Sequence, residues 1–242
     1  GMQRALALYR LGLRTEASTE WLWTVRKMND RALLAAAELA RVNGIWDRVI
    51  NTADRTVAEH DFTLRYPEPY GNVLSKQARA RKLDEPLVFG LVRQESRFIS
   101  DAKSSAGASG LMQLLPSTAR RIARKIGMKG FNTSRLGRPE VNAALGAYYL
   151  RHVLDGFGGN PALAAAAYNA GPGRARSWCD AKPLEGAIYI ETIPFAETRQ
   201  YVKKVMANTV YYAAVMGGDQ RSLKSRLGTI EGAMAMKADA NK

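Results

Sequence analysis

The stretch LDEPLVFGLVRQESRF, residues 83–98, predicts a helix that carries a carboxyl group on its apolar side. Four of its residues fall at i, i+3, i+4 and i+7 and so share one helix face: Val88, Leu91, Val92 and Glu95. Burial disfavours the charged form of a carboxyl group and raises its pKa. Glu95 is therefore a candidate general acid, since such a group must hold its proton near neutral pH.

The same glutamate has a plainer interpretation. A glutamate at a helix end is often neutralised by neighbouring arginines, and Arg93 and Arg97 lie close to Glu95 in the sequence. For an arbitrary sequence this structural role is the more common one. The choice between the two interpretations depends on the residues that follow Glu95.

The composition is that of a folded protein with a strongly basic surface. Of its 242 residues, 46% are hydrophobic and 24% charged, which excludes a disordered chain. The 36 Lys and Arg residues outnumber the 22 Asp and Glu residues, giving a formal net charge of +14. Nucleic acid, anionic lipid and the carboxylate-bearing bacterial cell wall are all partners that such a surface attracts. The single Cys179 excludes an internal disulfide, and two histidines without a cysteine cluster argue against a zinc site.

Helical patterns cover almost the whole chain, so the sequence predicts an all-α fold. Besides the helix that begins after Asp84, the expected helices are Met2–Leu13, Ser18–Lys27, Asp30–Asn43, Trp46–His60, Ser117–Ile126, Pro139–Phe157, Asn160–Ala170 and Ala196–Met216. The segment YIETIPF, residues 189–195, is expected to be extended.

A change of composition divides the chain. Pro67, Pro69 and Gly71 would interrupt any helix and mark a boundary. We therefore predict three parts, a helical segment, a second domain and a loosely held tail, over residues 1–65, 66–217 and 218–242.

Several motifs follow one another in a fixed order. Glu95–Ser96 read ES, Gly110–Gln113 read GLMQ and Ala167–Gly171 read AYNAG, followed by ETIPFAETRQYV at Glu191–Val202. In order and spacing, these blocks resemble the family 1 soluble lytic transglycosylases. The resemblance spans about residues 84–216 and implies a lysozyme-like catalytic domain. The first 60 residues resemble the linker part of the helical superhelix that precedes this domain in larger members.

The resemblance implies a mechanism with Glu95 as its only catalytic carboxyl group, whereas most glycosidases need two. Glu95 would cleave the β-1,4 bond between N-acetylmuramic acid and N-acetylglucosamine in peptidoglycan, first as an acid and then as a base. The muramyl C6 hydroxyl would attack C1 and leave a 1,6-anhydromuramyl product. A nucleophile within the same molecule has a high effective concentration and can compete with water. No metal or cofactor is implied.

The resemblance also implies residues that bind the substrate: Ser104, Met112, Gln113, Tyr168, Asn169 and Glu191. Ser104 would hold the N-acetyl carbonyl, Met112 would pack on a sugar face, and Tyr168 would place its hydroxyl near Glu95. Asn169 would fix its loop, and Glu191 would meet a sugar or the peptide stem. Ordinary core packing is the alternative for Met112 and Tyr168.

The compartment and partners follow from the same resemblance. We expect a monomeric enzyme of the Gram-negative periplasm that acts on peptidoglycan glycan strands, with cell-wall synthesis enzymes as candidate partners. The first residues lack the apolar segment and cleavage site of a secretory signal, and Gly1 before Met2 suggests a tag remnant. We therefore expect the exporting signal peptide to be absent from this sequence.

Three other functions compete with this one. A hydrolase of the goose-type lysozyme kind would also centre on one glutamate, and a non-catalytic glycan-binding module would keep the fold alone. The segment RRIARKIGMK, Arg120–Lys129, raises nucleic-acid binding. No known nucleic-acid-binding motif accompanies it, so a solvated face or a patch for the anionic wall is favoured and no nucleic-acid partner is expected.

Overall fold

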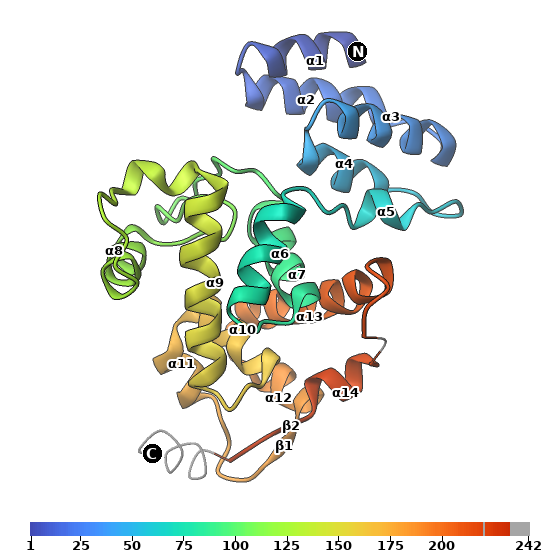
Figure 1. Cartoon of the computed structure of the whole chain (residues 1–242). Helices are drawn as coiled ribbons and strands as arrows, with labels where there is room; N and C mark the ends of the chain where they lie inside the picture. Colours follow the sequence, from blue (N-terminus) through green and yellow to red (C-terminus); the bar gives the residue numbers. More distant parts are fainter. Residues whose placement is uncertain (220, 233–242) are drawn as a thin grey trace. The chain divides into compact units, whose positions relative to one another are not determined.

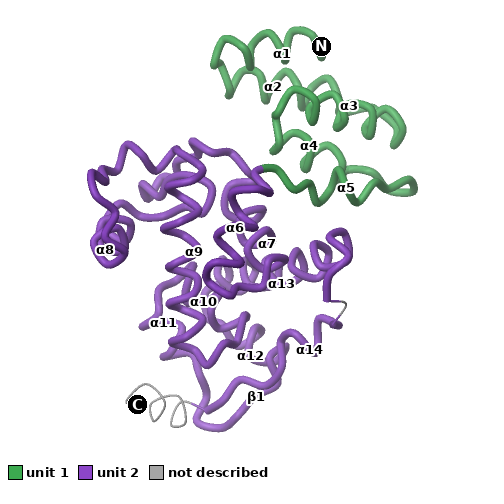
Figure 2. Tube along the Cα trace, viewed as in Figure 1, with its two compact units in different colours: residues 1–69 green, residues 70–242 purple. Residues whose placement is uncertain are grey.

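The computed structural model describes residues 1–219 and 221–232 and divides into two compact units, residues 1–69 and 70–242 (Figure 2). Helices dominate both units (Figure 1), and the predicted all-α class is confirmed. None of the helices in the described ranges combines the length and apolar character needed to cross a bilayer.

The first unit consists of short helices packed in pairs: α1 (Met2–Arg10), α2 (Arg14–Val25), α3 (Asp30–Val42), α4 (Trp46–Ala53) and α5 (Phe62–Arg65). Helix α1 packs on α2, and α3 packs on α4. The fully buried Trp21 joins two of these helices, since its indole N–H donates to the Thr52 hydroxyl over 2.9 Å. Asn29 caps α3 by accepting the Ala32 N–H over 3.0 Å.

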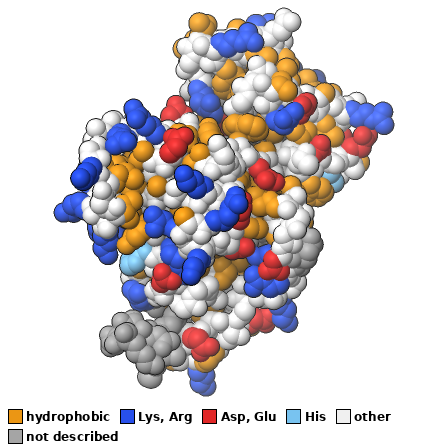
Figure 3. Space-filling view, viewed as in Figure 1, with side chains coloured by type: hydrophobic (Ala, Val, Ile, Leu, Met, Phe, Trp, Pro, Cys, Tyr) orange, Lys and Arg blue, Asp and Glu red, His pale blue; other side chains and the backbone are white. Residues whose placement is uncertain are grey.

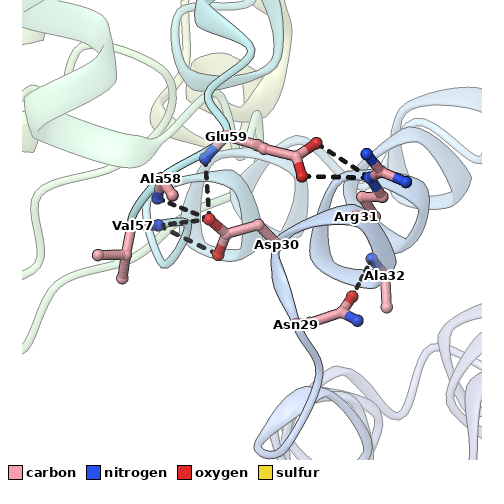
Figure 4. Close-up of polar contacts among 7 residues, drawn as sticks. All are labelled: Asn29, Asp30, Arg31, Ala32, Val57, Ala58 and Glu59. Atoms are coloured by element: carbon pink, nitrogen blue, oxygen red, sulfur yellow. Dashed lines mark hydrogen bonds and ion pairs between the residues drawn. The ribbon is translucent and has the colours of Figure 1, made fainter.

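A partly exposed carboxylate closes the loop that follows α4 (Figure 4). Asp30 accepts hydrogen bonds from three successive N–H groups, those of Val57, Ala58 and Glu59, with shortest lengths of 3.1, 2.7 and 2.9 Å. The Glu59 N–H, followed by that of Ala58, lowers the Asp30 pKa below its usual value. Helix α4 therefore ends at Ala53 and not at the predicted residue 60, because the chain turns to meet this carboxylate.

The second unit contains α6 (Gly71–Ala80), α7 (Glu85–Ser96), α8 (Pro116–Lys125), the 3₁₀ helix η1 (Thr133–Gly137), α9 (Pro139–Asp155), α10 (Pro161–Ala170), α11 (Pro172–Ser177), β1 (Leu184–Glu185), α12 (Gly186–Thr192), α13 (Ala196–Val215), α14 (Leu223–Leu227) and β2 (Thr229–Ile230). Helix α6 was not predicted. It begins at Gly71, directly after the proline-rich segment that marked the boundary.

Helix α7 is the centre of this unit and packs most extensively on α13. Every residue from Pro86 to Val92 is buried, so α7 is covered on all sides and not only on one face. Gly90 allows the close approach of the two helices, since a Cβ atom there would lie 3.0 Å from the Thr209 backbone nitrogen. The position of Glu95 is thereby tied to α13.

Two predictions about the C-terminal part are wrong. Most of the segment predicted to be extended is helical, because α12 continues to Thr192. The predicted loose tail is folded over residues 221–232, where β2 pairs antiparallel with β1. The buried Arg226 forms an ion pair with Asp84 at 2.9 Å, which anchors α14 at the start of α7. The rest of the predicted tail, 233–242, lies outside the described residues.

Candidate active site

Glu95 lies in the last turn of α7, facing α13. The Tyr201 hydroxyl of α13 donates a hydrogen bond of 2.5 Å to Glu95 Oε1. Burial raises the pKa of Glu95 to about 7, against the opposing effect of this hydrogen bond, which favours the charged form. The side chain still keeps part of its surface open to solvent. Glu95 thus holds a proton near neutral pH at a position that a ligand can reach.

A strained turn fixes the end of α7 beside this carboxyl group. Arg97 and Phe98 both have positive φ values, 48° and 63°, which are unfavourable for residues with a side chain. Ser96 accepts the Phe98 N–H at its hydroxyl over 3.1 Å and donates to the Val92 carbonyl. The Phe98 ring is almost fully buried. Packing and hydrogen bonds together therefore hold a turn that the backbone alone disfavours.

The GLMQ turn is held by one buried amide. Asn142 of α9 has no exposed surface, accepts the Met112 N–H over 2.8 Å and donates to the Ser109 carbonyl over 2.9 Å. Gly110 has φ +82°, and a Cβ atom there would lie 2.1 Å from the Asn142 side-chain nitrogen. The turn thus requires glycine both for its backbone conformation and for the space that Asn142 fills.

Tyr168 of α10 connects this turn with Glu95. Its hydroxyl donates to the Met112 carbonyl over 2.8 Å. Burial raises the pKa of Tyr168 well above its usual value, and the nearby Glu95 charge adds to the effect. The pKa of Tyr201 is raised by burial and then by Glu95, with a smaller effect of Tyr168. One carboxyl group and two tyrosines from three helices thus form a single buried cluster.

Comparison with known families shows which family this chain belongs to. Residues 72–188 match the Transglycosylase SLT domain, residues 192–221 the Soluble lytic transglycosylase helical domain and residues 1–57 the Soluble lytic murein transglycosylase L domain. The chain belongs to the soluble lytic transglycosylase family.

Individual relatives agree with this assignment. The soluble lytic murein transglycosylase of Escherichia coli (strain K12) is 33% identical over 227 residues, which cover 93% of this chain and 35% of that protein. The lytic transglycosylase Slt of Pseudomonas aeruginosa, solved as an inactive glutamate-to-glutamine mutant, has a TM-score of 0.82 and 39% identity, covering 91% of this chain and 36% of that one. The 70-kDa soluble lytic transglycosylase of Escherichia coli has a TM-score of 0.79 and 31% identity, covering 94% and 36%.

The chain spans about a third of the length of these soluble lytic transglycosylases. The likeness to their solved structures confirms the predicted lysozyme-like fold. Since the structural likeness runs over nine-tenths of this chain, it includes both compact units.

Of the residues predicted for the soluble lytic transglycosylase site, Ser104 lies on the loop before the GLMQ turn and Gln113 is the last residue of that turn. Ser104 is exposed, and its hydroxyl oxygen accepts the Ala108 N–H over 3.0 Å. Gln113 adopts a positive φ of 44°, and its side-chain nitrogen donates to the Gly110 carbonyl over 2.8 Å and to the Ala102 carbonyl over 3.2 Å. The Gln113 amide therefore closes the loop that carries Ser104.

Met112 does not have the surface that a sugar contact requires. Its side chain has no exposed area and packs on Gly146 of α9, where a Cβ atom would lie 2.3 Å from the sulfur. The expectation that Met112 packs on a sugar face is therefore wrong for this structure, and core packing describes it. Met112 contributes to the site through its backbone carbonyl, which accepts the hydrogen bond from the Tyr168 hydroxyl.

Asn169 and Glu191 both contact α13 and not the Glu95 carboxyl group. Asn169 accepts a hydrogen bond of 2.7 Å from the Thr198 hydroxyl, which ties the end of α10 to α13. Glu191 of α12 is exposed and forms an ion pair with Lys203 at 2.5 Å. In this structure both side chains join elements of the domain.

Sequence reasoning missed Tyr201 and Asn142, the residues that hold Glu95 and the GLMQ turn. Tyr201 falls within the ETIPFAETRQYV block, and helical spacing puts it on the same face as the buried Val205. Asn142 lies among buried residues of α9. In both cases the available signal was a polar group on a buried helix face, where it needs a partner.

Proposed function

We propose that this chain is the catalytic part of a lytic transglycosylase that cleaves the bond between N-acetylmuramic acid and N-acetylglucosamine in peptidoglycan. The observation that carries the proposal is the Glu95 pKa of about 7 in a cluster with two tyrosines. Burial raises this pKa and the Tyr201 hydrogen bond partly offsets the rise, so neither effect comes from a second carboxylate of the kind that a two-carboxylate glycosidase uses.

Glu95 performs two proton transfers in this mechanism. The protonated carboxyl group gives its proton to the bridging oxygen as the bond from C1 of the muramyl residue to that oxygen breaks. The N-acetyl group of the same sugar stabilises the cationic centre at C1. The Glu95 carboxylate then takes the proton of the C6 hydroxyl while this oxygen attacks C1. The 1,6-anhydro product forms without water, and Glu95 recovers its proton.

The neighbours of Glu95 support both steps. The Tyr201 hydroxyl donates to Oε1 and stabilises the carboxylate that the first step creates. Tyr168 keeps the GLMQ turn beside the carboxyl group through the Met112 carbonyl. Ser104 and Gln113, on the loop that this turn closes, are the residues we assign to the sugar N-acetyl group and ring. The inactivity of a glutamate-to-glutamine mutant of the Pseudomonas aeruginosa relative supports a catalytic glutamate.

The proposal assigns a role to each part of the chain. Residues 66–217, extended by the folded segment 221–232, carry the activity, and residues 1–65 form part of a helical linker. We place the enzyme in the periplasm, where peptidoglycan lies in Gram-negative bacteria.

Product analysis tests this function. Purified peptidoglycan sacculi are digested with the protein, and the soluble muropeptides are separated and weighed by mass spectrometry. We expect 1,6-anhydromuramyl ends, each one water lighter than the corresponding hydrolytic product. A Glu95→Gln variant purified in the same way controls for contaminating enzymes. Products that carry only reducing-end muramic acid would identify a hydrolase and contradict the proposed mechanism.

A further inference from the structure

A pocket of about 220 Å³ lies at the end of α7 that is remote from Glu95. Asp84, the residue directly before α7, lines this pocket, whereas Glu95 belongs to the last turn of the same helix. Since α7 has 12 residues, its two ends lie ~18 Å apart. The pocket is therefore separate from the catalytic carboxyl group.

Three arginines and a single carboxylate, that of Asp84, line the pocket. Arg151 comes from α9, Arg226 comes from α14, and Arg221 lies two residues before α14. In Figure 3, blue and red side chains lie next to one another where Figure 1 draws α14. Three positive charges against one negative charge leave the lining with a positive excess, which favours an anionic ligand.

Two of these guanidinium groups use only their terminal nitrogens. Arg226, whose side chain is 3% exposed, donates to Asp84 over 2.9 Å and to the Asp219 carbonyl over 2.6 Å. Arg151 pairs with Asp155 at 2.6 Å, also through a terminal nitrogen. Among the described residues, the buried Nε atoms of both arginines have no hydrogen-bond partner. Buried N–H groups are almost always hydrogen-bonded, so two such donors on residues of one pocket indicate an acceptor that binds there.

The other walls of the pocket indicate what carries this acceptor. Leu87, Leu154 and Met206 are apolar and would remain uncovered by water or by inorganic phosphate. The volume is far above the ~10–15 Å³ that one water needs and below the ~300 Å³ at which sites for drug-sized ligands begin. A carboxylate offers two acceptor oxygens and no donor. A small organic acid therefore matches the charge, the apolar walls and the size.

We propose that this pocket binds a small carboxylate with a short alkyl chain. Its oxygens accept the Nε–H groups of Arg151 and Arg226, and its chain packs on the apolar walls. The ligand joins α14 to α9 and to the start of α7, and so stabilises the second unit. This site goes beyond the proposed function and needs no glycan at Glu95, so each proposal can fail without the other.

Thermal unfolding tests whether such a ligand binds. The thermal midpoint of the protein is measured in sodium butyrate, sodium acetate and sodium phosphate, each against sodium chloride at the same ionic strength. We expect a rise of roughly 3–6 °C with butyrate at ten times its Kd, and a smaller rise with acetate, whose chain covers less of the apolar walls. Butyramide, which has nearly the same shape without the charge, should have no effect.

Three results of these measurements would overturn the proposal. They are the absence of a rise with either carboxylate, an equal rise with butyramide, and a rise with phosphate but not with butyrate. The last result would make the ligand an inorganic anion.

Methionine methyl groups show where the ligand binds. Met206 lines the pocket, Met128 lines a groove beside α8, and Met112 lies in the GLMQ turn. Magnetic resonance spectra of the protein with isotope-labelled methionine methyl groups are recorded during a butyrate titration, with Met206→Leu to assign one signal. We expect a saturable shift of the Met206 signal alone. A shift of Met128 or Met112 without one of Met206 would place the anion elsewhere and contradict the site.

Conservative substitutions test the two donors. Arg151→Lys and Arg226→Lys each keep the positive charge but remove an Nε–H group, so the Kd for butyrate should rise about tenfold in each. Arg124→Lys, at an exposed arginine outside the pocket, is the matched control and should leave the Kd unchanged. Because Arg226 is buried, its variant must first match the circular dichroism of the wild type. The partly exposed Arg151 is the safer site, and an unchanged Kd in Arg151→Lys would defeat the assignment.

Discussion

Asp30 in the first unit and Glu95 in the second carry the same chemical group, but their pKa values are shifted in opposite directions. Asp30 lies partly exposed at the surface and accepts hydrogen bonds from three backbone N–H groups, which lower its pKa. Glu95 accepts one hydroxyl hydrogen bond in a buried site, and its pKa rises to about 7. The first arrangement favours a permanent negative charge, and the second favours a proton that can be given away. The surroundings of a carboxyl group, and not its residue type, therefore decide between a structural and a catalytic role.

The largest expected effect concerns turnover. Glu95→Gln keeps the shape of the side chain but cannot transfer a proton, so muropeptide release should fall at least ~100-fold. Asp30→Asn should leave turnover unchanged, because Asp30 belongs to the first unit and holds the loop after α4. Rates of muropeptide release from sacculi measure both. Comparable losses of turnover in the two variants would contradict a catalytic role for Glu95 and a structural role for Asp30.

The second prediction concerns stability and its pH dependence. The folded-state pKa of Glu95 is above its unfolded value, so its favourable contribution is present below pH 4.5 and is lost as pH rises through about 7. Glu95→Gln should therefore be more stable than the wild type at pH 8, by at most ~3 kcal/mol, with no gain at pH 4. Urea unfolding at the two pH values measures the difference. A destabilised Glu95→Gln variant at pH 8 would contradict the burial that we assign to this group.

The third prediction separates the two tyrosines. Tyr201→Phe removes the hydrogen bond that favours charged Glu95, so the Glu95 pKa should rise further and turnover should fall about tenfold. The alkaline limb of the pH–rate profile should move to higher pH. Tyr168→Phe is the matched control, because its hydroxyl donates to the Met112 carbonyl and not to Glu95. A larger shift in the Tyr168 variant than in the Tyr201 variant would reverse the roles of the two hydroxyl groups.

The smallest expected effect concerns the stability of the first unit. The pKa of Asp30 is lowered by folding, so its contribution is present above the unfolded value and is lost as pH falls through the folded value. Asp30→Asn should lower the thermal midpoint at pH 7, and the difference should vanish in strong acid. Glu16→Gln, an exposed residue of the same unit, controls for the loss of one charge. A pH-independent loss in Asp30→Asn would mean that the carboxylate charge is not the cause.

Local patterns predicted the helices that have strong end signals. Asn160 followed by Pro161 marks the start of α10, where the Asn160 side chain accepts the Ala162 and Leu163 N–H groups. The helix predicted from Ala196 also begins at that residue, although no side chain caps it. The short α12 and α14, of seven and five residues, were missed or wrong, and both are held by contacts with other parts of the domain. Short helices of this length are not stable on their own, so their sequences carry a weak signal. Helix α6 was also missed, although its ten residues equal those of α10, because no side chain caps its start.

By itself, the sequence determined the all-α class, the longer helices and the place of Glu95 on a helix face that is mostly buried. Periodicity and helix caps act within a few residues, which is why they can be read without the fold. Only the tertiary structure decided which tyrosine donates to Glu95, that Met112 is core, and how far the Glu95 pKa rises. These depend on desolvation and contacts between α7, α10 and α13, helices that are far apart in the sequence.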